Sequence, residues 1–298
     1  MDQENTLLYA QACSKINLYL KVTGKRDNGY HELESLFLPL ASPADDIAID
    51  TEALPGAVTV GSSDIMLPGG MSNIAGRAAM LWAKKAAHVP HWDINIVKNI
   101  PVAAGMGGGS SDAATVLRLL NTANGSPLSR EVLAEAALEL GADVPFFLEP
   151  VPAVMTGLGE IASPLDFKLK NLHILLLAPG FPVSAAEGYK LMPPAQISPM
   201  DRDVRFGIME SLQSGDSEKL AALLFNDLQP GVFYKYPILK TLCSNMLATG
   251  ALTAMMTGSG PTLFALYPDE KTLNAAQEEL TALYPEFRLL KAVTADTL

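Results

Sequence analysis

The chain has 298 residues, of which 49% are hydrophobic and 18% are charged, and its formal net charge is −11. This composition excludes a disordered chain and allows one large domain or two modest ones. The chain carries 32 acidic residues against 21 basic ones, which argues against a nucleic-acid partner because such binding needs clustered Lys and Arg.

The N-terminus and the cysteines indicate the cellular compartment. Residues 1–5, MDQEN, lack the basic and apolar segments of a signal peptide, and no apolar run reaches the ~18 residues that cross a bilayer. Cys13 and Cys243 are the only cysteines, which is too few for a disulfide framework. We therefore expect a soluble cytoplasmic protein with no membrane partner.

The beginning of the chain predicts β-strands. Residues 13–22 alternate, with Ile16 and Leu18 on one face and Lys15 and Asn17 on the other. A turn-rich hairpin is predicted at residues 23–29, a second strand at 30–37 and a short strand at 46–50. One face of the first strand is predicted to be core, whereas its polar face could line a site.

Helices and strands are predicted to alternate in the middle of the chain. Helical spacing begins at Asn73, and residues 93–98 alternate like a strand. The apolar stripe of residues 113–120 predicts a helix, with Ser110 or Ser111 as its N-cap and Asn124-Gly125 as its end.

Another predicted helix extends from Ser129 to the glycine at its C-terminus, Gly141. Asp143 follows this helix end directly, and Pro145 prevents the helix from continuing. We therefore expect the Asp143 side chain to be held by a rigid backbone segment at the end of this helix.

The second half of the chain predicts a mixed α and β region. We expect a buried strand at 173–177, helical segments within 217–225 and 235–249, a glycine turn at 255–262 and a strand at 263–266. The sequence PGFP at 179–182 predicts a break in the chain. We place a domain boundary there, giving domains of residues 1–178 and 179–298.

The loop between the strand at 93–98 and the following helix has the sequence PVAAGMGGGSSDAA, residues 101–114. Its glycines let backbone N–H groups approach an anion, and the helix N-terminus adds a positive dipole end. The order of residues excludes two known phosphate-binding motifs. It is not a P-loop, since no lysine follows the glycines, and it does not match the GxGxxG fingerprint of dinucleotide-binding proteins. A flexible surface loop is the alternative, but a phosphate cradle fits the strand, loop and helix order better.

Six motifs resemble those of one family in the same order. GMGGGSSDAA at 105–114 resembles the PxxxGLGGGSSDAA signature of the GHMP kinases, with Met106 in place of the usual Leu. The others are SKINLYL at 14–20, GYHEL at 29–33, GADVPFF at 141–147, and NDL at 226–228 followed by TGSG at 257–260. On these motifs the chain is identified as a member of the GHMP kinase family.

The resemblance implies an α+β fold with a ribosomal-S5-like N-terminal domain, an α+β C-terminal domain, and ATP and substrate bound between them. It further implies transfer of the ATP γ-phosphate to a substrate hydroxyl, with Asp143 accepting the hydroxyl proton and Lys15 lying beside it as an electrostatic partner. Without the glycine loop, Asp143 could be an ordinary acid at a helix end, and Lys15 could belong to a solvated strand face.

The family pattern also implies the ATP-binding residues, with the phosphates at the glycine loop and the adenine near Asn73 and Lys98. The loop residues are Pro101, Val102, Ala103, Ala104, Gly105, Met106, Gly107, Gly108, Gly109, Ser110 and Ser111. Mg²⁺ is expected to bridge the phosphates. The sequence indicates no protein ligand for a metal, because the histidines at 88, 91 and 173 lack partners at ligand spacing.

The GYH motif resembles that of family members whose small-molecule substrate carries a cytidyl diphosphate group. The resemblance implies that Tyr30 and Tyr189 stack on the cytosine, that His31 bonds the base edge and that Asn17 also binds this substrate. We expect a monomer or a homodimer. The alternatives are a GHMP kinase for another small alcohol, such as homoserine or mevalonate, and a noncatalytic RNA-binding protein.

Overall fold

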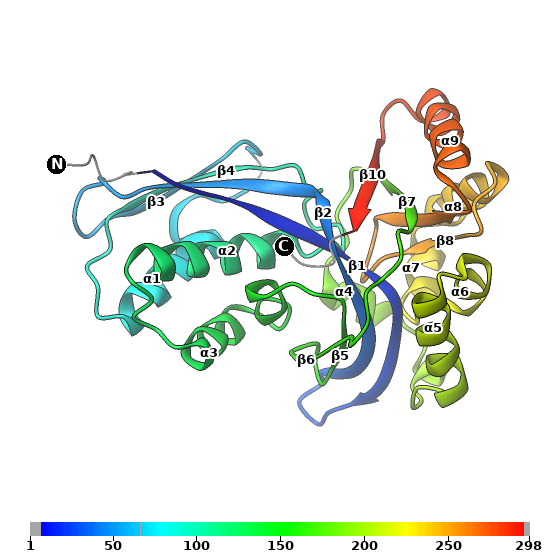
Figure 1. Ribbon diagram of the computed structural model, residues 1–298, viewed down its shortest axis with the longest axis horizontal. Helices are drawn as coiled ribbons and strands as arrows, with labels where there is room; N and C mark the ends of the chain where they lie inside the picture. The colour runs from blue at the N-terminus through cyan, green and yellow to red at the C-terminus, as the bar shows by residue number, and fades with distance from the viewer. Residues whose placement is uncertain (1–6, 66, 295–298) are drawn as a thin grey trace. The chain divides into compact units, whose positions relative to one another are not determined.

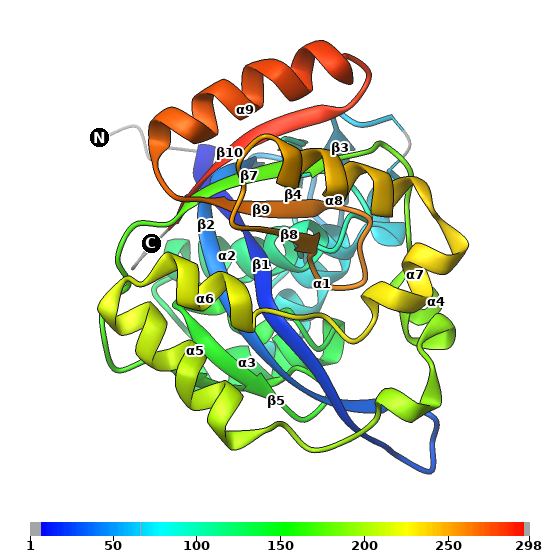
Figure 2. The same ribbon diagram turned by 90° about the vertical axis from the view of Figure 1, so that its right-hand side faces the viewer.

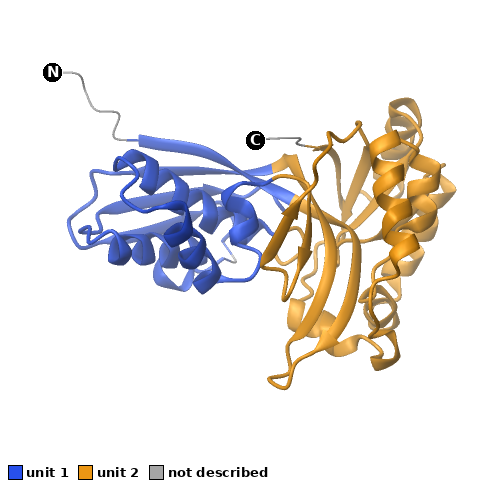
Figure 3. Ribbon diagram, turned by 60° about the horizontal axis from the view of Figure 1, so that its bottom comes forward, with its two compact units in different colours: residues 1–14, 44–100, 107–150 blue, residues 15–43, 101–106, 151–298 orange. Residues whose placement is uncertain are grey.

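The computed structural model describes residues 7–65 and 67–294 of the chain (Figure 1). It divides into two compact units (Figure 3). Unit 1 comprises residues up to 14, 44–100 and 107–150, and unit 2 comprises residues 15–43, 101–106 and those from 151 onward. The two units are therefore interleaved along the sequence.

The strands β1 (Leu7–Lys25) and β2 (His31–Asp50) each contribute one part to unit 1 and one part to unit 2. The hairpin predicted between them is confirmed. The prediction of a separate strand at 46–50 was wrong, because these residues are the end of β2. Residues 33–40 of β2 are all buried, so both faces of the strand are covered and no alternation marks it as one element.

The sheet of unit 1 contains the end of β2 and two further strands. β3 (Val58–Ser62) is parallel to β4 (Trp92–Val97), and β4 is antiparallel to β2, with Val97 opposite Asp46. The helix α1 (Ile74–Lys85) connects β3 to β4, which makes a βαβ unit. The strand predicted at 93–98 is confirmed within one residue at each end.

Helices α1, α2 (Gly108–Ala123) and α3 (Arg130–Leu140) pack together in unit 1. The buried rings of Trp82 and Trp92 meet edge to face with centroids 5.6 Å apart, and the Trp82 indole N–H donates to Asn121 Oδ1 at 3.2 Å. Ser129 caps α3 as predicted. Two short 3-10 turns complete the unit, η1 (Gly70–Ser72) and η2 (Pro145–Leu148).

Unit 2 contains an antiparallel sheet in the order β10, β7, β9, β8 (Figure 2). These strands are β10 (Arg288–Thr294), β7 (His173–Ala178), β9 (Leu263–Tyr267) and β8 (Thr253–Met256). A hairpin of β5 (Ala153–Thr156) and β6 (Ile161–Pro164) pairs through β5 with β2, where Met155 lies opposite Ser35. The strands predicted at 173–177 and 263–266 are confirmed.

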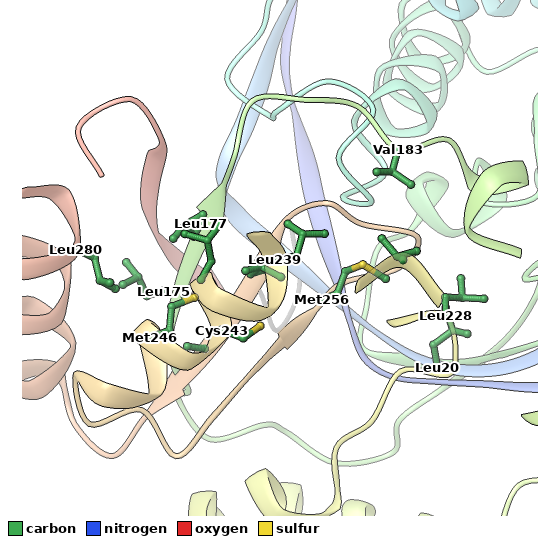
Figure 4. Packing of buried hydrophobic residues seen from close by; sticks show 14 of the residues in the cluster. Leu20, Leu175, Leu177, Val183, Leu228, Leu239, Cys243, Met246, Met256 and Leu280 are labelled. Carbon is green, nitrogen blue, oxygen red and sulfur yellow. The ribbon is translucent and has the colours of Figure 1, made fainter. Parts of the chain in front are cut away.

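Helices α8 (Ile238–Ala248) and α9 (Glu270–Leu283) pack against this sheet, and their apolar side chains meet those of β7 and β9 in one buried cluster (Figure 4). Every residue of β9 is buried, so both of its faces are covered. The remaining helical elements are α4 (Ala185–Leu191), η3 (Pro194–Gln196), α5 (Arg202–Ser214), α6 (Ser217–Leu223) and α7 (Gln229–Lys235).

The predicted domain boundary at 178/179 falls directly after β7. This strand pairs with β9 and β10, which lie in the second predicted domain. The boundary stays a prediction. No helix among the described residues is long and apolar enough to cross a membrane.

Candidate active site

The polar side chains of β1 are buried rather than solvated. Residues 12–20 of this strand are all buried, and Lys15 and Asn17 are 4% and 3% exposed. The Lys15 ammonium donates to Asn17 Oδ1 at 2.6 Å and to the Gly105 carbonyl at 2.8 Å, and it lies 4.8 Å from the centroid of the Phe37 ring. The alternative of a solvated strand face for Lys15 is therefore wrong.

Asn17 is oriented by the neighbouring strand. Its Nδ2 donates to Ser35 Oγ at 2.7 Å, and the Ser35 hydroxyl donates to the Tyr19 carbonyl at 2.6 Å. The amide oxygen of Asn17 is consequently fixed toward Lys15. The Lys15 ammonium is therefore buried beside acceptors that are themselves held in place.

The first half of the glycine loop, residues 101–106, belongs to unit 2. It is attached to β1 through the Lys15 N–H, which donates to the Met106 carbonyl at 3.0 Å. Gly105 has a φ of +77°, and a Cβ there would overlap the Thr257 carbonyl oxygen. Only glycine fits at this position, where the loop brings its carbonyl to the Lys15 ammonium.

The second half of the loop, residues 107–111, belongs to unit 1 and begins α2. Gly107 is the N-cap with a φ of +75°, and the Ser111 N–H already donates to the Gly107 carbonyl at 2.9 Å. The prediction of Ser110 or Ser111 as N-cap was wrong, since both lie within the first turn. The first N–H groups of a helix have no acceptor in the helix itself, so residues 108–110 can offer theirs to an anion.

A buried group of three charges lies behind this helix start in unit 1. The Lys98 ammonium donates to Asp112 Oδ2 at 2.8 Å and also to Asp45 Oδ2. Asp45 is fully buried, and its other oxygen accepts the N–H groups of Asn99 and Ile100 at 2.6 and 2.8 Å. Asp112 Oδ1 is buried with no hydrogen-bond partner among the described residues.

Two carboxylates that share one ammonium cannot both be neutralised by it. Burial, opposed by Lys98 and reinforced by Asp45, raises the pKa of Asp112 to about 7. Burial alone would lower the pKa of Lys98, but the two carboxylates raise it. The sequence motifs predicted no role for either carboxylate. The position of Asp112 in the first turn of the predicted phosphate-binding helix was the available signal.

Both predicted adenine-binding residues lie in unit 1 with their polar atoms engaged. Asn73 is the N-cap of α1, where its Oδ1 accepts from the Ala75 N–H and its Nδ2 donates to the Pro68 carbonyl, each at 3.0 Å. The Lys98 side chain is 5% exposed. The adenine contacts predicted for these two side chains stay predictions.

Asp143 is partly buried and lies in unit 1, two residues after Gly141 at the end of α3. Gly141 is the C-cap of the helix as predicted, and the Val144 N–H donates to the Gly141 carbonyl at 3.1 Å. Pro145 begins η2 two residues after Asp143. A tight backbone turn therefore carries this carboxylate, and its catalytic role stays a prediction.

The predicted base-binding residues belong to unit 2. The rings of His31 and Tyr189 stack with centroids 5.2 Å apart and an interplanar angle of 9°, and the neighbouring Tyr30 is 63% exposed. Burial and the charge of Lys25 lower the pKa of His31, which favours a neutral ring with one donor and one acceptor nitrogen. His31, and not Tyr30, stacks on Tyr189, and the exposed ring of Tyr30 is available for a ligand.

Unit 2 thus brings together Lys15, Asn17 and Gly105, and also His31 and Tyr189, whereas unit 1 places Lys98 behind the start of α2. Within residues 7–65 and 67–294, no group of three or more His, Cys, Asp or Glu side chains could hold a metal ion. The rings of His88 and His91 stack on Trp92.

The sequence matches two family profiles. The profile of the GHMP kinase N-terminal domain matches residues 73–149, and that of the GHMP kinase C-terminal region matches residues 208–286. The first range contains the glycine loop and Asp143. The second ends two residues before β10 begins.

The chain is also similar to curated proteins along most of its length. It is 33% identical to the 4-diphosphocytidyl-2-C-methyl-D-erythritol kinase of Alkaliphilus oremlandii, covering 97% of this chain and 98% of that protein. It is 37% identical to the kinase of the same name from Geobacter sulfurreducens, covering 92% and 95%. Both values lie well above the level at which the fold alone is shared.

Solved structures give the same result. A crystal structure of 4-(cytidine 5'-diphospho)-2C-methyl-D-erythritol kinase covers 97% of this chain and 100% of its own, at a TM-score of 0.79 and 32% identity. The homoserine kinase of Cytophaga hutchinsonii has a TM-score of 0.75 at 14% identity, covering 99% and 97%, which shows a shared fold alone.

Proposed function

Because the chain belongs to the GHMP kinases, which use ATP, we propose that it phosphorylates the 2-hydroxyl of 4-diphosphocytidyl-2-C-methyl-D-erythritol in non-mevalonate isoprenoid precursor biosynthesis. The observation that carries this proposal is the extent of the similarity to kinases of that name, at 33–37% identity over more than nine-tenths of the chain. The stacked pair of His31 and Tyr189, with Tyr30 exposed beside it in sequence, supports a planar base as part of the substrate.

The reaction forms a bond between the substrate oxygen and the γ-phosphorus of ATP and breaks the bond from that phosphorus to the β,γ-bridging oxygen, so that ADP leaves. We assign the proton of the attacking hydroxyl to the Asp143 carboxylate, because a carboxylate can take a proton that becomes acidic as transfer proceeds. The Lys15 ammonium would stabilise negative charge on the transferred group.

We propose that the first turn of α2 binds the phosphates of ATP through its backbone N–H groups. The N–H groups of Gly108, Gly109 and Ser110 are those that the helix leaves without an internal acceptor. Asn73 and Lys98 are proposed on the adenine side, and Asn17, Tyr30, His31 and Tyr189 on the side of the cytidyl substrate.

Mg²⁺ is proposed as the metal cofactor, held mainly by phosphate oxygens. Of the two loop serines, Ser110 is partly exposed and Ser111 is buried, so Ser110 is the better candidate ligand. When bound, Mg²⁺ would neutralise charge on the β- and γ-phosphates.

The test measures ADP release with Mg-ATP and the cytidyl-methylerythritol substrate, with mevalonate and homoserine in parallel. We expect turnover with the cytidyl compound alone. Turnover with another alcohol would keep the kinase chemistry and contradict the base-binding roles. RNA binding that weakens with salt, in the absence of any turnover, would support a noncatalytic binding protein instead.

A further inference from the structure

The turn between β8 and β9 reaches the polar face of β1. Its first residue, Thr257, is fully buried, and its Oγ1 accepts from the Asn17 backbone N–H at 2.8 Å. The same hydroxyl lies 3.4 Å from Asn17 Oδ1, the oxygen that accepts from Lys15. One hydroxyl group therefore contacts both the backbone and the side chain of Asn17.

A second buried side chain clamps this turn. Asn226 is 7% exposed, and its Nδ2 donates to the carbonyls of Met256 and Gly258, each at 2.8 Å. These two carbonyls flank Thr257. The two hydrogens of the carboxamide nitrogen are thus both donated to the turn. The Asn226 Oδ1 accepts from the Leu228 N–H at 2.9 Å, which holds the carboxamide in this orientation.

Asn226 is itself anchored to β1. The Leu20 N–H donates to the Phe225 carbonyl, and the Asp227 N–H donates to the Leu20 carbonyl, both at 3.0 Å. The clamp and the strand that carries Lys15 therefore share one piece of backbone. A displacement of the turn relative to Lys15 would have to break these hydrogen bonds.

The backbone of the turn also packs closely against one side of the ammonium. Gly258 has a φ of +56°, and a Cβ there would lie 2.9 Å from the Gly105 carbonyl oxygen and 3.3 Å from Lys15 Nζ. The Gly105 carbonyl is one of the acceptors of Lys15. The backbone of the turn therefore limits where both the ammonium and its acceptor can lie.

We propose that Asn226 and Thr257 are positioning residues that hold the Lys15 ammonium for phosphoryl transfer, an inference that rests on the proposed function. Asn226 fixes the turn, Thr257 fixes Asn17, and Asn17 fixes Lys15. A lysine side chain has several rotatable bonds, so its ammonium takes one position only when its acceptors are themselves held. Catalysis is sensitive to such placement because misplacement by about 1 Å can cost ~10²-fold.

The test compares Thr257→Val with Thr257→Ser. Valine keeps the shape of threonine and removes the hydroxyl, whereas serine keeps the hydroxyl. We expect Thr257→Val to lower kcat by roughly 10- to 100-fold with KM for ATP within about 3-fold, and Thr257→Ser to keep kcat within about 3-fold. Equal kcat values for the wild type and Thr257→Val would overturn the proposal.

A double-mutant cycle separates positioning from loss of stability. If Thr257 acts through Lys15, Thr257→Val will not lower kcat further in a Lys15→Met background. Additive losses would overturn the proposal. Asn226→Ser tests the clamp by a second route and should lower kcat, whereas Asn121→Ser, at a buried amide bonded to Trp82 and Leu128, should lower Tm with kcat unchanged.

A readout independent of activity is the nitrogen-15 resonance of the Lys15 ammonium, assigned by its loss in Lys15→Met. It should shift or broaden in Thr257→Val and stay at its wild-type position in Thr257→Ser. An unchanged resonance in Thr257→Val would overturn the proposal even if turnover fell. Absence of wild-type turnover would instead contradict the proposed function, and the resonance would still report whether Thr257 holds Lys15.

Discussion

Asp143 is carried by a backbone turn that few changes of its own side chain can disturb. The preceding Gly141 ends α3, and the following Pro145 begins η2. We therefore expect Asp143→Asn to remove the proton acceptor and leave the backbone in place. The predicted result is a fall in kcat by roughly 10²- to 10⁴-fold with ATP affinity nearly unchanged.

Steady-state kinetics and ATP titration check this prediction. The matched control is Glu139→Gln, which removes an acid from α3 that pairs with Lys85 at 2.6 Å. This variant should keep kcat, since Glu139 has no proposed role in catalysis. Near-normal kcat in Asp143→Asn would exclude Asp143 as the base.

Asp112 should make stability depend on pH in a direction opposite to that of an ordinary ion-paired acid. Its folded pKa is about 7, whereas an unfolded Asp has a pKa of about 4. The folded state therefore binds the proton more tightly, and this stabilisation is full below about pH 4 and is lost as pH rises to about 7. The side chain of Asp112→Asn does not titrate, so this variant does not lose the stabilisation as pH rises.

Urea unfolding at pH 5 and pH 8 tests this expectation. The free energy of unfolding of Asp112→Asn minus that of the wild type should increase from pH 5 to pH 8 by roughly 2 kcal/mol. Asp166 is an exposed acid, so the free energy of unfolding of Asp166→Asn minus that of the wild type should be the same at pH 5 and pH 8. A constant or falling difference for Asp112→Asn would contradict the shared-ammonium arrangement.

At the scale of elements, the sequence predicted best those segments whose ends carry strong local signals. The helix α3 was predicted with both of its ends, because Ser129 and Gly141 are strong local signals. The strand β2 was divided because residues 33–40 are buried on both faces. The start of α2 was misplaced because serines usually cap helices, whereas here a glycine in the left-handed region does so.

The motifs identified the candidate site, but the contacts that organise it could not be predicted. The helices α5 and α9 were missed, although Asp201 and Asp269 cap them. Sequence motifs named Asn226 and Thr257 without a role, because their partners are distant in sequence. Thr257 and Asn17 are separated by 240 residues, and only the fold brings such residues together.

The helix α4, which carries Tyr189, is packed against α7 by a glycine. A Cβ at Gly231 in α7 would overlap the Leu191 carbonyl at the end of α4, and a backbone atom cannot move aside as a side chain can. Gly231→Ala should therefore displace α4. We expect it to lower the free energy of unfolding by about 1–3 kcal/mol and to raise KM for the cytidyl substrate more than KM for ATP.

Gly207→Ala is the matched control, since Gly207 is also a buried helical glycine. Its added Cβ would lie 2.8 Å from Leu223 Cδ1, the flexible end of a side chain. Stability within about 1 kcal/mol of the wild type is expected there, because alanine also favours the helix. Equal effects of the two substitutions on both KM values would contradict the role of α4.

At the scale of the whole molecule, the two compact units cannot be separated by one cut of the chain. The chain passes between them at 14/15, 43/44, 100/101, 106/107 and 150/151. β1 and β2 each contain residues of both units. Unfolding of either unit therefore pulls on strands that the other unit also uses, and the full chain should unfold in one transition.

The predicted domains of residues 1–178 and 179–298 can be tested as separate fragments. The cut would leave β7 in the first fragment and its partners β9 and β10 in the second, and Ile174, Leu175, Leu176 and Leu177, all fully buried in the full chain, would lose their cover. Loss of this burial weakens both fragments, because apolar side chains of this size contribute about 1.5–3 kcal/mol each. We therefore expect neither fragment alone to show a cooperative thermal transition by circular dichroism, and mixing the two to restore one. Cooperative unfolding of residues 1–178 alone would instead show that the boundary at 178/179 separates independent folding units.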